Sequence, residues 1–176
     1  MRAVRCAFAG EYVGRPTGIG FRPVADSDFD FLCVVYASAR AAEMALVDWS
    51  DEQKARFIAS QCALQDRHYR SVYIGADMLL IEKDSKPIGR IYIFRSASEI
   101  RLMDIALMPE WRNRGIGSAL IRELMEEASE RGCSITLHVE PDNPAQKLYE
   151  RFGFTLIENR GVYDFLGWEP VRIEPS

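Results

Sequence analysis

The sequence predicts a single α+β domain, and three observations lead to this fold class. A chain of 176 residues and 20.0 kDa suits one domain with a sizeable core. Strand-like apolar segments and helix-like amphipathic segments alternate along it, without an internal repeat or a low-complexity linker. The strongest helical pattern, at 118–131, lies between strand-like segments at 100–107 and 135–140. We therefore expect a sheet flanked by helices.

In the first half of the chain, turn and cap residues mark the ends of the predicted elements. Pro23 ends a first strand, and Asp26 or Ser27 caps the helix after it. Ser50-Asp51-Glu52-Gln53 is a capping-box pattern that starts a second helix. Asp84-Ser85-Lys86 is the turn of a hairpin. The predicted elements are a strand at 19–22, a helix at 29–42, a helix from the capping box to about 67, and strands at 78–83 and 87–94.

The second half predicts a further strand at 100–107 and then two strand–helix alternations. Five apolar residues fall on one face of the helix at 118–131, which Gly132 ends. They are Leu120, Ile121, Leu124, Met125 and Ala128. Pro144 suits the first turn of a later helix. The remaining predicted elements are a strand at 135–140, a helix at 144–152, and strands at 155–159 and 162–168.

Composition and charge argue against several classes of protein. The net charge of -4 gives no general attraction for nucleic acid or acidic membranes. No apolar run approaches the roughly 18 residues of a membrane span. The four cysteines include no Cys-x-x-Cys pair and only two histidines are present, so neither a disulfide framework nor a metal site is indicated. We expect a cytoplasmic protein that binds neither nucleic acid nor membranes.

The two ends of the chain are expected to lie outside the domain proper. Residues 1–16 carry early arginines and too short an apolar stretch for a signal peptide, so we expect a short, loosely held extension. The domain itself is predicted to span 17–170, followed by a tail at 171–176.

The most informative segment is Arg112-Asn113-Arg114-Gly115-Ile116-Gly117, which lies between a predicted strand and a predicted helix. A glycine-rich turn at a helix start points several backbone N–H groups at one place, and the helix macrodipole adds partial positive charge there. Gly115 and Gly117 allow a close approach of the backbone and a positive φ. The segment therefore indicates a phosphate or pyrophosphate site, unless the glycines only serve a tight turn.

Two common phosphate loops do not fit this segment. A P-loop requires a lysine after its last glycine, but Gly117 is followed by Ser118 and Ala119. A Rossmann fingerprint requires a third small residue, where this chain has Leu120, and it requires an acidic residue about 20 positions further on that is not clearly present. The loop therefore either binds another phosphate ligand or only makes a tight strand-to-helix turn.

A second motif follows about thirty residues later, at Asn143-Pro144-Ala145-Gln146-Lys147-Leu148-Tyr149-Glu150-Arg151-Phe152-Gly153-Phe154. Together with Arg-x-x-Gly-x-Gly at 112–117, it resembles the acyl-CoA-binding core of the GNAT-type N-acetyltransferases. The lead-in at 104–111 also resembles the strand before that family's pyrophosphate loop. The resemblance covers about 100–154, and earlier residues match only in the order of their elements.

The resemblance implies a fold and an activity. The fold is a single GNAT-like domain whose mixed, mostly antiparallel sheet is splayed between its fourth and fifth strands. The activity is direct transfer of an acetyl group from acetyl-CoA to a primary amine of a small molecule or peptide, without a metal. A non-catalytic acyl-CoA sensor or interaction module is the alternative. Dimers are frequent in the family, so a homodimer is also open.

The resemblance also implies which residues hold CoA. The backbone of Ile105, Ala106 and Leu107 would pair with the pantetheine amides, as a peptide adds to a sheet edge. The pyrophosphate would lie on the loop and the first helical turn, with charge-assisted bonds from two arginines. The loop residues are Arg112, Asn113, Arg114, Gly115, Ile116, Gly117 and Ser118. Asn143 would bind the cofactor or a water, or only cap the next helix.

Tyr149 is the candidate general acid. A phenol with a pKa near 10 can return a proton to a thiolate leaving group, and the family places its acid tyrosine at this position of the motif. The alternative is a core tyrosine, because Leu148, Tyr149 and Phe152 could form one apolar face.

The general base is less well defined, with three candidates. His138 and Glu140 lie two apart on a predicted strand and therefore share a face. A carboxylate near the position of His138 takes the amine proton in several family members, and a histidine, with a pKa near 6.5, also suits that task. Asp104 is the third candidate, although strand alternation directs it toward a helix. Water alone is the remaining alternative. Acceptor choice is expected to involve the early helices and the C-terminal hairpin, which carry many aromatic residues.

Overall fold

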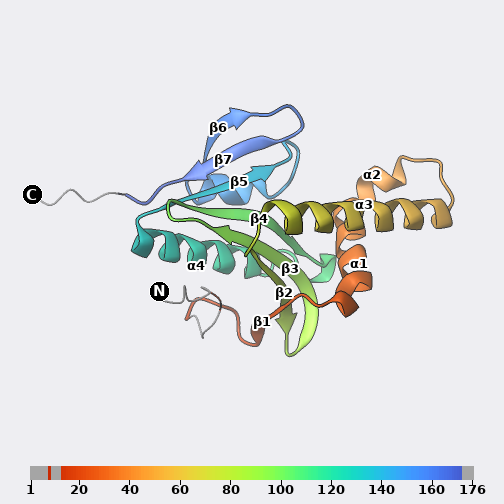
Figure 1. The fold of residues 1–176 in the computed structure, drawn as a ribbon, viewed down its shortest axis with the longest axis horizontal. Coiled ribbons are helices and arrows are strands. Elements are labelled where there is room, and N and C mark those ends of the chain that lie inside the picture. Colours follow the sequence, from red (N-terminus) through yellow and green to blue (C-terminus); the bar gives the residue numbers. More distant parts are fainter. Residues whose placement is uncertain (1–7, 9–12, 172–176) are drawn as a thin grey trace, which may run out of the picture. The chain divides into compact units, whose positions relative to one another are not determined.

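The structure is a computed structural model that describes residue 8 and residues 13–171. Figure 1 shows the elements in chain order. They are β1 (Ile19–Pro23), the short 3-10 turn η1 (Asp26–Asp28), α1 (Phe29–Ala39), α2 (Ala41–Ala45), α3 (Asp51–Val72), β2 (Asp77–Lys83), β3 (Lys86–Arg95), β4 (Glu99–Leu107), the 3-10 turn η2 (Pro109–Trp111), α4 (Ile116–Arg131), β5 (Ser134–Val139), α5 (Gln146–Arg151), β6 (Thr155–Asn159) and β7 (Asp164–Trp168).

The seven strands form one mixed sheet of order β1-β2-β3-β4-β5-β7-β6. β4 and β5 pair in parallel, whereas β1–β2, β5–β7 and β6–β7 pair antiparallel. The β2–β3 hairpin turns at Asp84 and Ser85, whose φ values of 49° and 65° belong to the tight two-residue hairpin turn. The predicted α+β class, with a mixed and mostly antiparallel sheet, is confirmed.

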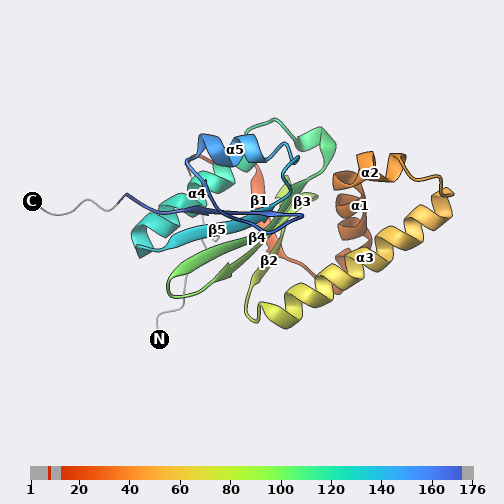
Figure 2. The same ribbon diagram turned by 90° about the horizontal axis from the view of Figure 1, so that it is seen from above.

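The chain packs as two compact units, and β3 and β4 run through both of them. The unit made of 18–92 and 104–114 contains α1, α2 and α3. Figures 1 and 2 show α1 lying alongside α3 in this unit. Their apolar faces form a core with β2 that consists of Leu32, Tyr36, Ile58, Cys62 and Leu80.

The other unit contains α4, α5 and strands β5–β7. α4 buries the predicted apolar face, except that Met125 is only half-buried. Apolar burial of this kind is the main source of stability for a helix in a protein. Gly132 ends α4 in the left-handed conformation, with φ 63°, as predicted.

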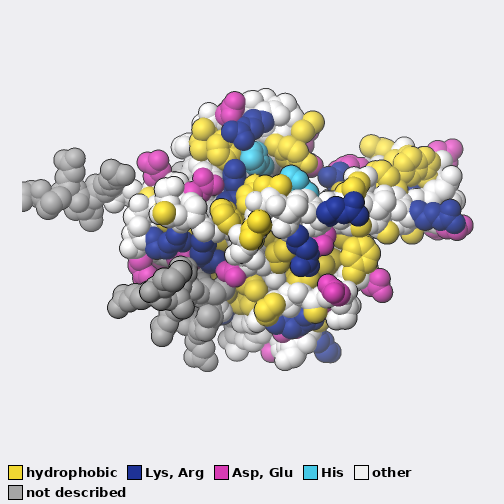
Figure 3. Space-filling view, in the orientation of Figure 1, with side chains coloured by type: hydrophobic (Ala, Val, Ile, Leu, Met, Phe, Trp, Pro, Cys, Tyr) yellow, Lys and Arg dark blue, Asp and Glu magenta, His cyan; other side chains and the backbone are white. Residues whose placement is uncertain are grey.

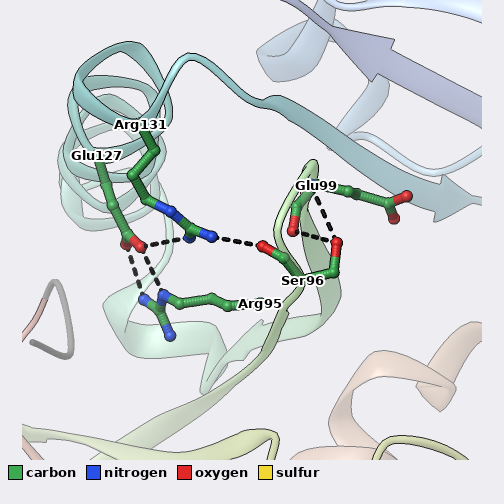
Figure 4. A network of polar contacts seen from close by, with 5 residues as sticks. All are labelled: Arg95, Ser96, Glu99, Glu127 and Arg131. Carbon is green, nitrogen blue, oxygen red and sulfur yellow. Dashed lines mark hydrogen bonds and ion pairs between the residues drawn. The ribbon is translucent and has the colours of Figure 1, made fainter. Parts of the chain in front are cut away.

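A polar network fixes the C-terminal half of α4 to the turn between β3 and β4 (Figure 4). The guanidinium of Arg95 donates to both oxygens of Glu127, at 2.7 and 2.9 Å. Arg131 also donates to Glu127, at 3.0 Å, and to the carbonyl of Ser96. The side chains of Arg95 and Glu127 are 8% and 11% exposed, so this ion pair is largely shielded from water. The opposite end of α4 carries the glycine-rich loop.

Some predicted boundaries were wrong in the helical segments. The helix expected at 29–42 ends at Ala39, and α2 is a separate short helix. Neither Asp26 nor Ser27 caps α1, because both belong to η1. The capping box at Ser50 and Gln53 is confirmed by reciprocal bonds of 2.9 and 3.2 Å, although α3 runs five residues beyond the predicted end. α5 is shorter than expected and begins at Gln146.

The described part of the N-terminal segment contacts α4. Phe8 is buried, and Arg15 forms an ion pair with Glu123 in which both side chains are nearly inaccessible. The other residues of the expected extension, 1–7 and 9–12, lie outside the described residues, as does 172–176 of the expected tail. Among the helices that are described, none is long and apolar enough to cross a membrane.

Candidate active site

The loop before α4 takes its shape from two residues with positive φ. Asn113 has φ 57° and Gly115 has φ 78°. Gly115 is the N-cap residue of α4, and a β-carbon added there would meet no described atom within 4 Å. Gly115 is therefore required by its backbone conformation rather than by crowding. Gly117 differs from the expectation, because it lies within the right-handed helix and does not need a positive φ.

The first turn of α4 presents backbone amides that the helix does not use. Its first internal bond runs from the Ala119 N–H to the Gly115 carbonyl, at 3.0 Å. The amides of Ile116, Gly117 and Ser118 precede that bond, where helix geometry provides no carbonyl acceptor. No acidic side chain occupies this turn. The helix start therefore combines unused donors with the positive end of the macrodipole, which is the arrangement that binds a phosphate.

The structure brings the two sequence motifs together. α4 and α5 lie side by side on the same side of β5 (Figure 2). A β-carbon on Gly117 would lie 3.7 Å from Cδ2 of Leu148, and Arg151 donates to the hydroxyl of Ser118 at 2.9 Å. The start of α4 is thus in direct contact with the helix that carries Tyr149.

The end of β4 leaves its partner strand. The parallel pairing with β5 stops at Leu102 and Leu137, and β4 continues to Leu107. On the β3 side, the carbonyl of Ala106 points at Gly89, where an added β-carbon would be only 2.3 Å from it. Backbone groups alternate sides along a strand, so those of Ile105 and Leu107 point to the edge away from β3. This edge is the one expected to pair with pantetheine, and Ala106 faces the other way.

The two loop arginines behave differently from each other. Arg112 donates from Nε to the carbonyl of Leu107 at 2.9 Å and from Nη2 to the hydroxyl of Ser38 at 3.1 Å. Its guanidinium therefore ties the loop to the end of β4 and to α1. Arg114 stacks over the ring of Trp111, at 5.1 Å from its centroid. Both arginines are exposed, and because a ring stack holds Arg114 less firmly than two hydrogen bonds hold Arg112, Arg114 is the better placed to turn toward a phosphate.

Tyr149 and Asn143 are both held by local contacts. The side chain of Tyr149 is buried and its ring packs on Phe154, with 5.6 Å between the ring centroids. The side-chain oxygen of Asn143 accepts a hydrogen bond from the Ala145 N–H at 2.9 Å, just before α5 begins. The N-cap residue of α5 is Ala145, and no side chain caps this helix, so the bond forms a turn before α5 and the cap role expected for Asn143 was wrong.

His138 lies at the centre of a group of aromatic and basic side chains. Its ring stacks on Phe165, with 4.9 Å between centroids and 26° between planes, and lies edge-on to Tyr163. Nη1 of Arg160 is 3.2 Å from Nε2 of His138, so Nε2 accepts a hydrogen bond from the arginine. Partial burial of the ring, followed by the nearby charges of Arg101 and Arg160, lowers the pKa of His138 below its ordinary value. The imidazole is therefore neutral at pH 7.

A family model for acetyltransferases of the GNAT type matches residues 36–154, which is about two thirds of the chain. The chain belongs to the acetyltransferase (GNAT) family. This confirms the family resemblance that the motifs at 112–117 and 143–154 indicated. The matched region is longer than the resemblance seen in the sequence, because it begins at residue 36, within α1.

Named GNAT relatives match the chain over part of its length. A Bacillus subtilis (strain 168) protein, named as a candidate alanine N-acetyltransferase of ribosomal protein bS18, is 36% identical over 81 residues, covering 44% of this chain and 53% of the relative. The mycothiol acetyltransferase of Corynebacterium glutamicum (strain R) is 30% identical over 95 residues, covering 52% of this chain and 32% of the relative. The matched segments thus span about half of these curated relatives or less.

A solved GNAT structure agrees in fold over most of the chain. The PaiA N-acetyltransferase of Thermoplasma acidophilum, in complex with coenzyme A, superposes with a TM-score of 0.64 at 20% identity. The match covers 86% of this chain and 99% of that protein. At this identity the likeness concerns the fold alone.

The other two candidate bases of this GNAT domain have different surroundings. Glu140 lies just after β5, where its backbone carbonyl accepts from the Asn143 N–H at 3.0 Å. Asp104 accepts a bond of 2.6 Å from Arg90, which also donates to Gln65 of α3 at 2.8 Å. The side chains of Arg90 and Asp104 are 5% and 15% exposed. Asp104 thus faces a helix, as strand alternation indicated, and its charge neutralises a buried arginine.

Sequence reasoning did not single out Gly89, Arg151 or Arg160. Gly89 follows Ile88 in an ordinary strand pattern. The reason for a glycine there is the close approach of the Ala106 carbonyl, which only the structure shows. Arg151 lies inside the second motif, three residues before its final Phe154. Its position in the motif could therefore have marked it as a residue near the site. Arg160 lies in the connection between β6 and β7, and no local pattern connects it with His138. Among the described residues, no group of three or more His, Cys, Asp or Glu side chains could hold a metal ion.

Proposed function

We propose that this chain transfers an acetyl group from acetyl-CoA directly to a primary amine. The observation that carries the proposal is the contact between the amide-rich start of α4 and the helix bearing Tyr149, through Leu148 and Arg151. A phosphate held at the first turn would lie beside the helix that supplies an acid. This is the arrangement that a CoA-dependent transferase requires.

CoA is bound by backbone groups in this proposal. The amides of Ile116, Gly117 and Ser118 hold the pyrophosphate, and Arg114 leaves its stack on Trp111 to add a charge-assisted bond. The protein itself does not require a glycine at 117, because a β-carbon there would lie at ordinary contact distance from its neighbour. A ligand that approaches the backbone closely would explain why this position has no side chain. The edge of β4 at Ile105 and Leu107 pairs with the pantetheine amides.

Tyr149 and His138 handle the protons. His138, neutral at pH 7, takes a proton from the substrate ammonium, with Glu140 as the alternative base. The amine nitrogen then forms a C–N bond at the thioester carbonyl while the C–S bond breaks. Tyr149 gives its phenolic proton to the departing thiolate, and the proton that the acylated nitrogen then loses restores the phenol, so that the products are the amide and the CoA thiol. No covalent enzyme intermediate is needed, and burial raises the pKa of the Cys33 thiol to about 12, which makes it a poor nucleophile.

Two measurements test the proposal. Calorimetry should detect CoA binding, and a thiol-release assay with acetyl-CoA and a panel of primary amines should detect turnover. The Gly117→Ala variant should lose CoA affinity, while Gly20→Ala should keep it, because Gly20 lies in β1 with no described atom near its missing side chain. Absence of CoA binding would overturn the assignment.

A CoA-binding sensor without turnover is the second candidate. The burial of Tyr149 favours it, because a tyrosine packed on Phe154 needs no catalytic role to explain it. CoA binding together with no thiol release on any amine would support the sensor. The named relatives act on different acceptors, so the acceptor is sought among small molecules and peptides. We place the protein in the cytoplasm, where its three described cysteines stay free thiols.

A further inference from the structure

One face of the sheet in the unit of β5–β7 carries an unusual cross-strand group. Arg101 of β4 is in register with Thr136 of β5, and His138, two residues further on, is in register with Phe165 of β7. Residues two apart on a strand share a face. Arg101, Thr136 and His138 therefore line the same face, opposite the buried Ile135 and Leu137.

Two arginines converge on the ring of Phe165. The guanidinium carbon of Arg101 lies 4.9 Å from the ring centroid and that of Arg160 lies 4.3 Å from it. His138 stacks on the same ring. We call Arg101, His138, Arg160 and Phe165 the basic-aromatic cluster. In the space-filling view, basic and histidine side chains gather over β5–β7 (Figure 3).

Each arginine of the basic-aromatic cluster has a carboxylate near its Nε. Glu99 lies 3.4 Å from Nε of Arg101, and Glu158 lies 2.7 Å from Nε of Arg160. Nη1 of Arg101 is buried and has no hydrogen-bond partner among the described residues. Nη1 of Arg160 lies 3.2 Å from the imidazole of His138, which is a neutral acceptor.

An unpartnered buried guanidinium nitrogen is costly, since a buried donor without an acceptor loses its hydration. A single anion between the two guanidinium groups, at the positive edge of the Phe165 ring, would offer an acceptor to Nη1 of Arg101 and give Nη1 of Arg160 a charged acceptor in place of a neutral one. Charge-assisted bonds of this kind are about twice as strong as neutral ones. The cluster is thus arranged to receive an anionic group.

We propose that the basic-aromatic cluster binds a carboxylate carried by the amine acceptor. This rests on the proposed function, because it places the acceptor's amine at His138. The substrate class is then an amino acid or a peptide with a carboxylate a few bonds from its amine, rather than a polyamine.

The proposal also connects binding with proton transfer. While Arg160 donates to Nε2 of His138, that nitrogen cannot accept a proton from the substrate. A bound carboxylate takes over Nη1 of Arg160 and frees Nε2. The ammonium of the same substrate then gives its proton to Nε2, which leaves a neutral amine beside an imidazolium. An amine without a carboxylate does not displace Arg160 from the imidazole, so Nε2 of His138 stays unable to accept a proton.

Matched acceptors test the substrate class. Thiol release would be measured with β-alanine, β-alaninamide and 2-aminoethylphosphonate, and with L-amino acids and dipeptides of increasing length beside their amides. We expect kcat/KM to be about tenfold or more higher for a carboxylate than for its amide. The amides have the lower amine pKa and are the more readily deprotonated, so chemistry alone would favour them. Equal rates would overturn the proposal, and a preference for the phosphonate would replace the carboxylate with a phosphate.

Variants assign the preference to the cluster. Arg160→Gln should remove most of the advantage of carboxylates, because KM for carboxylate acceptors rises while the amides gain a free Nε2 on His138. Arg160→Lys should restore part of the advantage. Arg56→Gln is the matched control, because Arg56 lies on α3 and its side chain is 78% exposed. An Arg160→Gln variant that loses rate equally with both classes would show a structural role instead.

Proton NMR provides a readout that does not depend on turnover. The chain has two histidines, so the imidazole signals of His138 and His68 can be assigned with one His138→Gln variant. Titration with β-alanine should shift the signal of His138 and leave that of His68 in place, and β-alaninamide should shift neither. A shift without thiol release would support the cluster and reject the transferase. Turnover without any shift of His138 would reject the cluster and keep the transferase.

Discussion

The carbonyl oxygen of Ala106 lies 2.3 Å from the position that a β-carbon on Gly89 would occupy. β4 therefore presses its last residues against β3 only because residue 89 has no side chain. The same contact turns the backbone of Ala106 toward β3 and that of Ile105 and Leu107 toward the other edge. The CoA-binding edge in our proposal thus depends on a glycine in the neighbouring strand.

Gly89→Ala should be destabilising, because the clash is with backbone, which cannot rotate away. Overpacking of this kind costs about 1–3 kcal/mol, and a protein of this size loses about 2–4 °C in Tm for each kcal/mol. CoA affinity should fall as well, since β4 must move. Thermal unfolding and calorimetry would measure both. The control is Gly20→Ala, at a strand glycine with open space around it. Equal losses of Tm and of CoA affinity in the two variants would contradict this account.

Gly117→Ala should have opposite effects on stability and on binding. Alanine favours a helix over glycine by about 0.5–1 kcal/mol, and its methyl would lie at ordinary contact distance from Leu148. The unliganded protein should therefore melt slightly higher. CoA affinity should fall on the order of tenfold, or about 1.4 kcal/mol, because the methyl projects where the phosphate approaches. Unchanged affinity would mean that the phosphate does not lie at this turn.

Tyr149→Phe should separate packing from proton transfer. The ring contact with Phe154 is kept, so CoA affinity should change little. Loss of a general acid typically lowers the rate by about 10²–10⁴-fold, and steady-state thiol release would detect this in kcat. Full activity in the variant would leave Tyr149 as a core residue. Phe154→Leu serves as a control that disturbs the packing and keeps the phenol.

The activity should depend on pH through His138. The base must be deprotonated, so kcat/KM should be low in acid and rise as pH passes the pKa of His138, which lies below that of an ordinary histidine. Arg160→Gln removes one of the charges that lower this pKa, so the acidic limb should move to higher pH. Rates would be measured from pH 5 to 9 with one acceptor. A limb that stays in place in the variant would favour Glu140 or water as the base.

Asp104→Ala should destabilise the protein strongly. It leaves Arg90, whose side chain is 5% exposed, without its charged partner, and breaking a buried pair costs about 3–5 kcal/mol. Chemical denaturation would measure the loss. Replacing both residues together, as Arg90→Met with Asp104→Leu, should recover most of it. The pH profile of the double variant should match that of the parent, because our proposal assigns the base to His138. A displaced profile would contradict this.

Local sequence patterns were sufficient for most elements of this fold. The capping box at Ser50, the turn at Asp84 and Ser85 and the Gly132 helix end act through bonds between near neighbours, so they can be read from a few letters. The break between α1 and α2 was missed because no Gly or Pro lies between Phe29 and Ala45, so no local signal marks the end of α1.

The sequence by itself determined the family, the order of the elements and the glycine-rich start of α4, because these depend on residues that are adjacent or share one helix. Only the tertiary structure decided which distant groups meet. It paired Asp104 with Arg90, Ala106 with Gly89 and His138 with Arg160. The two hydrogen-bonded pairs join residues 14 and 22 positions apart, and the register that brings such groups together is set by the burial of the whole sheet.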